Sequence, residues 1–125
     1  MVLVDTSVWV SHFRSASQIL VELAELDLII THSMVIAEIA CGTPPVPRLQ
    51  TLADIALLKP ATSASLSETR SFIEREQLYG LGCGIVDLML LASTLLTPNA
   101  QLWTLDRRLA ALAERFQVSF RNFNH

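Results

Sequence analysis

Four acidic residues of this 125-residue chain lie where an acid is unexpected. Asp5 follows the apolar run "VLV", and Asp106 follows "LWTL". Glu38 is surrounded by apolar residues in "VIAEIA", and Asp87 lies near the start of the apolar segment "GIVDLMLLASTLL". A buried carboxylate must be paired or neutralised, and lysine occurs once, as Lys59. The four acids are therefore candidates for a shared site.

The chemistry that such a group of acids supports is metal chemistry. Two carboxylates about 4 Å apart repel by roughly 4 kcal/mol at an effective dielectric near 20, and a divalent cation reverses the sign. Carboxylates without histidine or thiolate ligands suit Mg²⁺ or Mn²⁺ rather than zinc. Such an ion activates a water and neutralises charge on a phosphate. The acids therefore predict metal-dependent hydrolysis of phosphodiester bonds.

Three of the acids also have a structural interpretation. Asp5 and Asp106 can cap the helices that follow them, each worth about 1 kcal/mol, and Asp87 can interact with a helix dipole. Glu38, in mid-helix, has no capping role. The other glutamates lie among polar neighbours, where solvated surface is expected: Glu22, Glu25, Glu68, Glu74, Glu76 and Glu114.

Strands and helices alternate along the chain. The pattern predicts strands at 1–4, 27–30, 57–62 and 101–105, with a last one at 118–120. Helices are predicted at 6–13, 16–26, 33–42, 48–57, 65–80, 85–96 and 107–116. Ser33 is expected to cap one of them and Ser65 with Glu68 to form a capping box on another.

This alternation predicts an α/β fold, a three-layer sandwich whose central, mostly parallel sheet of four or five strands is flanked by helices. Residues 1–125 should form one domain. Sites in such sheets form beyond the carboxyl ends of the strands, near a topological switch point. Asp5 and Asp106 will be neighbours if the strands before them pair.

Composition restricts the partners and the compartment. Hydrophobic residues make up 51% and charged residues 17%, below the roughly 25% charged of typical domains, so part of the surface should meet another chain. The net charge of −3 argues against nucleic-acid binding through overall charge. No segment has the roughly 18 apolar residues of a membrane span, and no signal peptide is apparent, so a cytoplasmic location is expected. Cys41 and Cys83 are expected to be buried free thiols.

Four stretches, "LVDTSVWV", "SMVIAEIACG", "GIVDLMLLAS" and "LWTLDRRL", resemble in this order the PIN-domain family, specifically VapC-type toxins of bacterial toxin–antitoxin pairs. The resemblance implies an endoribonuclease with Mg²⁺ or Mn²⁺ held by Asp5, Glu38, Asp87 and Asp106. It also implies a homodimer, inhibited by a VapB-like antitoxin whose C-terminal segment lies over the active-site groove.

The resemblance also assigns the neighbouring residues. Thr6, Ser7 and Thr104 match hydroxyl positions that would orient acids or waters. Many relatives carry a further acid where this chain has Arg108, so one well-formed ion site is expected rather than two. Arg107 and Arg108 either contact RNA or belong to a solvated helix face.

Two other classes of function compete with a nuclease: a phosphate-accepting protein and a binding module. A phosphate-accepting receiver or aspartyl phosphatase also places acids at strand ends, but it needs a lysine at a late strand, and Lys59 comes too early in the chain. A binding module that kept the fold and lost the chemistry is disfavoured because all four acids are present.

Trp9, Phe13 and Trp103 are expected to pack in the core, and the histidines (His12, His32 and His125) show no ligand spacing.

Overall fold

A parallel sheet lies at the centre of the computed structural model, which describes residues 1–121, so that His125 lies outside the described part. Its strands are β1 (Val2–Val4), β2 (Ile29–Thr31), β3 (Lys59–Pro60) and β4 (Gln101–Trp103), in the order β3-β2-β1-β4. Every residue of β1 and β2 is buried. Strands covered on both faces need continuous apolar residues, which explains why the runs "VLV" and "LII" predicted them correctly.

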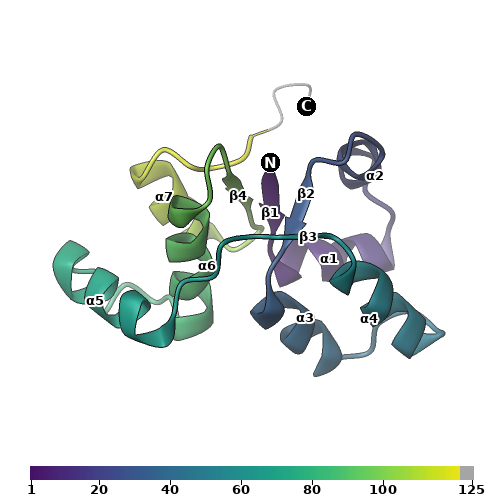
Figure 1. The fold of residues 1–125 in the computed structure, drawn as a ribbon, viewed down its shortest axis with the longest axis horizontal. Coiled ribbons are helices and arrows are strands. Elements are labelled where there is room, and N and C mark those ends of the chain that lie inside the picture. The colour runs from purple at the N-terminus through teal and green to yellow at the C-terminus, as the bar shows by residue number, and fades with distance from the viewer. Residues whose placement is uncertain (122–125) are drawn as a thin grey trace.

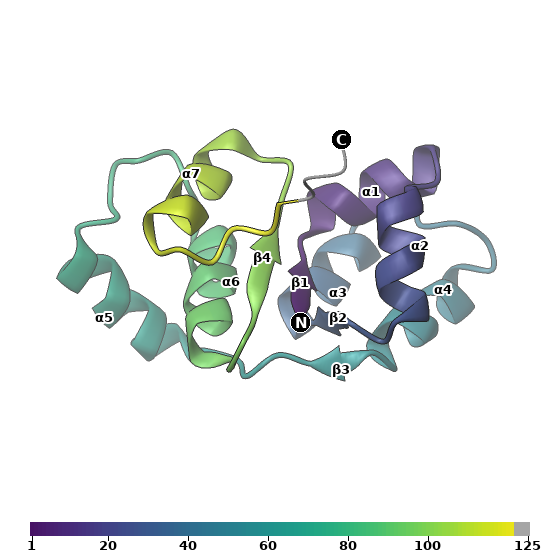
Figure 2. The same cartoon turned by 90° about the horizontal axis from the view of Figure 1, so that it is seen from above.

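Helices flank this sheet on both sides, which confirms the predicted three-layer α/β sandwich. Helices α5, α6 and α7 gather beside β4, while α1 to α4 surround β1, β2 and β3 (Figures 1 and 2). Their bounds are α1 Thr6–Arg14, α2 Gln18–Glu25, α3 Ser33–Ala40, α4 Arg48–Ala56, α5 Leu66–Glu76, α6 Ile85–Leu96 and α7 Arg107–Arg115. No helix within residues 1–121 has the length and apolar character that crossing a membrane requires.

The strand order reverses beside β1. The chain builds β2 and then β3 on one side of β1 and returns to place β4 on the other, with Leu3 opposite Leu102. This is a topological switch point, where the carboxyl ends of two adjacent strands leave room for a site. The backbone N–H of Asp5 donates to the carbonyl of Trp103 over 2.9 Å, so the expected pairing of the strands before Asp5 and Asp106 is confirmed.

Two expectations about local structure were wrong. The cap of α3 is His32 rather than Ser33, because the Nδ1 atom of His32 accepts a hydrogen bond of 3.0 Å from the N–H of Met34. Residues 118–120 form a single parallel bridge to β4 through Ser119 and Leu102 rather than a fifth strand. Within the described residues the sheet therefore has four strands.

Helix α5 begins as predicted and ends earlier than predicted. Ser65 and Glu68 form the expected capping box: the Ser65 hydroxyl accepts from the N–H of Glu68, and the Glu68 carboxylate accepts from the N–H of Ser65. The helix stops at Glu76 because Gln77 has a left-handed conformation (φ 56°). The predicted end near residue 80 was too late.

The apolar helix α6 is buried in its middle but exposed at its ends. Leu90 and Leu91 are inaccessible to solvent, whereas Leu95 and Leu96 are 40% and 46% exposed. Both cysteines are free, but Cys41 is exposed and Cys83 is half-buried, so the expectation of buried thiols was wrong. Burial is set by which face of an element meets the sheet, and residue type alone does not report it.

The buried His32 connects the end of β2 to helix α6. The Nε2 atom of His32 lies 3.0 Å from the hydroxyl of Ser93 on α6, and the same hydroxyl accepts from the N–H of Ala64 over 2.9 Å. Because Nδ1 accepts from Met34, Nε2 carries the proton and donates to Ser93. Burial lowers the pKa of His32, so the neutral ring holds β2 against α6.

Candidate active site

Asp5 is the buried member of the acidic group, with only 5% of its surface exposed. It occupies the cap position of α1, but its side chain does not cap the helix. Instead, its Oδ2 atom accepts hydrogen bonds from Ser7 Oγ at 2.7 Å and from Thr104 Oγ1 at 2.8 Å. Both hydroxyls bind the same oxygen, so Oδ1 is the atom that a cation could approach.

The hydroxyls that hold Asp5 are themselves held by the chain after β4. Ser7 Oγ accepts from the N–H of Leu105 over 3.0 Å, and Thr104 Oγ1 accepts from the N–H of Asp106 over 3.1 Å. The bond from Leu105 to Ser7 and the bond from Thr104 to Asp5 each span almost a hundred residues of sequence and join the ends of β1 and β4. The Asp5 carboxylate is thus fixed by the pairing of the two strands.

Asp106 does cap a helix. Its Oδ1 atom accepts from the N–H groups of Arg108 and Leu109 at 2.9 and 3.1 Å, which satisfies two free donors at the start of α7. The side chain is exposed beside the end of β4. The capping and the metal-binding interpretations of this residue are therefore compatible, since the cap uses one carboxylate oxygen.

Glu38 lies near the end of α3 and is exposed. The inference from its apolar neighbours was therefore wrong about its face: Val35 and Ile39 point into the core, and Glu38 points away from it. Its Oε1 atom accepts a hydrogen bond of 2.7 Å from the hydroxyl of Thr6. Because Thr6 follows Asp5, this bond brings Glu38 to the edge of the same site.

Asp87 lies in the first turn of α6, where its Oδ2 atom accepts from the N–H of Gly84 over 3.4 Å. Its pKa is raised, mainly by burial and also by the negative charges of Asp5, Asp106 and Glu38, while the bond from Gly84 opposes the shift. Asp5, Asp106 and Glu38 therefore all act electrostatically on Asp87. Burial raises the pKa of the half-buried Cys83 thiol, and the negative charges of Asp87 and Asp106 add to that rise.

Asp5, Asp106 and Glu38 lie near enough to Asp87 to act on its charge, but within residues 1–121 the four acids do not form a metal cage. No group of three or more His, Cys, Asp and Glu side chains in the described chain lies close enough together to hold an ion as it stands. The donor set nevertheless fits a hard cation, because it consists of carboxylates with hydroxyl support and carries uncompensated negative charge. Mg²⁺ typically keeps several waters and takes only one or two carboxylates, with substrate phosphate completing its shell.

The arginines near the site differ in their surroundings. Arg107 and Arg108 are both exposed at the start of α7. The side chain of Arg108 lies over Gly82, so closely that a Cβ atom there would stand 2.7 Å from its Cδ and Nη1 atoms. Farther along, Arg115 donates to the carbonyl of Glu76, and Arg121 pairs with Glu114. The positive charge of this segment is thus partly committed to local contacts.

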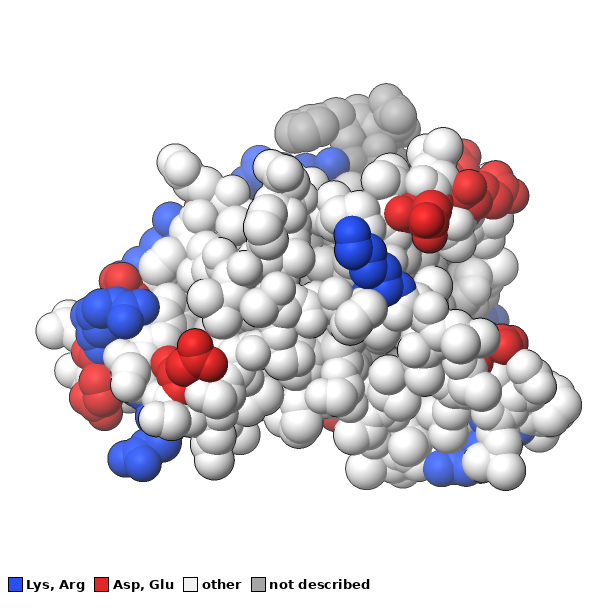
Figure 3. Space-filling view, viewed as in Figure 1, with Lys and Arg blue, Asp and Glu red and all other residues white. Residues whose placement is uncertain are grey.

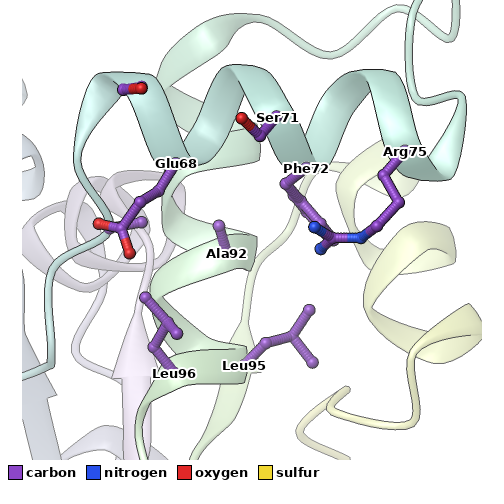
Figure 4. A pocket seen from close by; sticks show the side chains of 9 residues that line it. Glu68, Ser71, Phe72, Arg75, Ala92, Leu95 and Leu96 are labelled. Carbon is purple, nitrogen blue, oxygen red and sulfur yellow. The ribbon is translucent and has the colours of Figure 1, made fainter.

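A hollow of about 320 Å³ between α5 and α6 lies away from the acids (Figure 4). Leu95 and Leu96 line one side, and Glu68 and Arg75 line the other. Glu68 is used in the capping box, whose bonds to Ser65 lower its pKa. On the face drawn in Figure 3, acidic and basic side chains mix over α5, an acidic group lies over α2, and the other charged side chains are scattered. Neither feature offers chemistry that competes with the acidic group.

Sequence reasoning found the acids and their hydroxyl neighbours but missed the residues that position them. It did not anticipate that Gly84 donates to Asp87, or that Gly82 leaves room for Arg108. The only local signal was the spacing of glycines in "GLGCG". Arg108, which packs against Gly82 of that loop, belongs to helix α7, which begins more than twenty residues later.

The sequence profile of the PIN domain family matches residues 2–115. Two relatives are both named Ribonuclease VapC32, from Mycobacterium tuberculosis strains CDC 1551 / Oshkosh and ATCC 25618 / H37Rv. Each is 41% identical over 116 residues, which covers 91% of this chain and 92% of the relative.

Proposed function

This chain belongs to the PIN-domain family, and on that premise we propose that it is a metal-dependent endoribonuclease, the toxin of a VapBC-type pair. The observation that carries the proposal is that Asp5, Asp106 and Glu38 all act on the charge of Asp87 beside the switch point between β1 and β4. Burial raises the pKa of Asp87, and the negative charges of the other three acids add to that rise. A cluster of this kind favours a bound cation over an empty state.

In the proposal, Asp5, Glu38, Asp87 and Asp106 hold Mg²⁺ or Mn²⁺. Such an ion would lower the pKa of a water and offset charge on the scissile phosphate. Ser7 and Thr104 fix the buried carboxylate of Asp5 so that one oxygen faces the opening. Thr6 orients Glu38 in the same way. The cap bonds of Asp106 hold its carboxylate at the start of α7.

Arg108 is the side chain that we place against the RNA backbone. Its guanidinium lies at the entrance formed by Gly82 and Cys83, close enough to Cys83 to oppose the rise in the pKa of that thiol. A cation beside an acidic site can neutralise a phosphate flanking the one that is cut. Arg107, the exposed neighbour on α7, is assigned the same role. The expected single metal site is part of this proposal.

The proposal includes a homodimer and a VapB-like antitoxin in the cytoplasm. Support for the dimer comes from exposed leucines around the hollow between α5 and α6: Leu66 is 59% exposed, and Leu95 and Leu96 follow at 40% and 46%. Light scattering should give twice the chain mass for the wild type and the chain mass for Leu95→Glu.

Metal-dependent cleavage is the decisive test. Protein freed from any bound partner should cut single-stranded or looped RNA when Mg²⁺ or Mn²⁺ is present, and should stop when EDTA is added. Asp5→Asn and Asp87→Asn should each lower the cleavage rate by at least about 100-fold, as expected when a residue essential to charge stabilisation is lost. Asp27→Asn is the matched control, because Asp27 is exposed in a left-handed turn that asparagine tolerates.

The two other functions predict different results. Equal cleavage by the wild type and both site variants would assign the activity to a contaminant and leave a binding module. A receiver or phosphatase would form a covalent acyl phosphate on Asp5, visible as an acid-stable and base-labile adduct. The position of Lys59 disfavours the receiver, because it is exposed on β3, which β2 separates from β1.

A further inference from the structure

A second hollow, of about 460 Å³, lies between α1 and α3 and touches the acidic group. One side comes from the second half of α1, and the other comes from the end of α3 and the loop that follows it. The residues that matter here are Val10, Phe13, Arg14, Glu38, Ile39 and Thr43. Glu38 belongs to both places, since it lines this hollow and also accepts the hydrogen bond from Thr6. The hollow therefore borders the acidic group at Glu38.

Its walls combine apolar surface with a few polar groups. Val10, Phe13 and Ile39 contribute apolar side chains, while Arg14 and Thr43 bring a guanidinium and a hydroxyl. Single-stranded RNA is read by stacking of splayed bases on aromatic rings or guanidinium planes and by hydrogen bonds to the base edges. The volume lies within the roughly 300–1,000 Å³ range of small-ligand sites.

The loop wall is held in place before any ligand arrives. Arg48 donates from Nη1 to the carbonyl of Gly42 over 3.1 Å and from Nη2 to the carbonyl of Ala40 over 2.6 Å. Thr51 donates to the carbonyl of Pro45 over 2.8 Å. These bonds anchor the loop at both ends to α4. A site that is already formed loses less entropy on binding.

We infer that this hollow is a nucleobase subsite: it takes the base of a nucleotide that flanks the scissile phosphate, and it gives the enzyme its preference at that position. The inference rests on the proposed ribonuclease function and deepens it. The competing occupant is a helix of a partner protein, which would lay one face along the hollow. Arg14 at its edge favours the phosphodiester of a nucleotide over a basic peptide.

The test uses a single-stranded RNA library randomised around one position, with the cut ends read by sequencing. Wild-type protein should prefer particular bases at one flanking position. Val10→Trp fills the hollow while leaving all four acids in the chain, and it should reduce that preference on the order of 10-fold, the scale of one base stack. Its Mn²⁺ affinity, measured by calorimetry, should be unchanged. The control is Leu57→Trp, which adds the same side chain at an 83% exposed position on α4.

The possible results separate the inference from the function on which it rests. Metal-dependent cleavage with the same base preference in Val10→Trp and wild type overturns the subsite and leaves the nuclease intact. Loss of inhibition by a partner protein in Val10→Trp, with base preference unchanged, makes the hollow a peptide site and also overturns the inference. No cleavage by the wild type refutes both. If Val10→Trp unfolds, Arg14→Gln replaces it and should weaken the same preference several-fold, because Arg14 is exposed.

Discussion

Replacing Thr104 by valine tests whether strand pairing holds the central acid. Valine keeps the shape of threonine but removes the hydroxyl that donates to Asp5 Oδ2 over 2.8 Å. A hydrogen bond to a charged group contributes about 1.5–3 kcal/mol, and Asp5 is 5% exposed, so water cannot easily replace the donor. The N–H of Asp106 also loses its acceptor, but Asp106 is exposed and water can take that place.

The expected loss is therefore about 1.5–3 kcal/mol in the free energy of unfolding, set by the bond to Asp5. For a domain of this size the melting temperature should fall by about 6–12 °C. Because groups that orient metal ligands typically affect affinity by about 10–100-fold, Mn²⁺ binding should weaken by a similar factor. Urea unfolding in EDTA measures the first effect, and calorimetric titration measures the second.

Thr6→Val is the matched control. It removes the same kind of hydroxyl from a bond of similar length, 2.7 Å, but the acceptor is the exposed Glu38. Its loss should cost below about 1 kcal/mol, because solvent replaces the donor. If Thr104→Val and Thr6→Val unfold at the same urea concentration, the reasoning is wrong, and the Asp5 carboxylate does not depend on β4.

Asp87→Asn should stabilise the metal-free protein at neutral pH, because burial and three nearby acids raise the pKa of Asp87 and make its ionised form unfavourable in the fold; melting in EDTA measures this. For the same reason, the free energy of unfolding of the wild type should fall as the pH rises above the pKa that Asp87 has in the unfolded chain. Asp87→Asn should remove this part of the pH dependence. His32 has the opposite sign: burial lowers its pKa, so the stability it contributes is present above about pH 6.5 and is lost as pH falls through its folded pKa. His32→Gln should flatten the decline in unfolding free energy between about pH 6.5 and 5, and an unchanged slope would contradict the assignment. Gly82→Ala should cost about 1–3 kcal/mol, because φ is +86°, a conformation that L side chains rarely adopt. Gly84→Ala should cost less, because its φ is −86° and a new Cβ meets nothing within 4 Å; equal urea midpoints would refute the strain at Gly82.

Several features of this protein follow from short stretches of sequence. The apolar triplet before Asp5 predicts β1, because a strand covered on both faces has to be apolar throughout. The capping box of Ser65 and Glu68 marks the start of α5, because both bonds close within four residues. The placement of four acids is the basis for proposing a metal-binding group, because isolated carboxylates are costly among apolar residues. These are local properties, and local sequence determines them.

Tertiary structure decided everything that depends on which distant segments meet. Pairing of β1 with β4 brings Thr104 to Asp5, and no spacing within either segment specifies that contact. The exposure of Glu38 depends on how α3 rotates against the sheet, so its apolar neighbours predicted its surroundings wrongly. The hollow beside Glu38 exists because Arg48 on α4 anchors a loop against α1 and α3. Such features arise from packing between distant segments. Each needs the right residue at its position, but the local sequence does not reveal which segment that residue will contact.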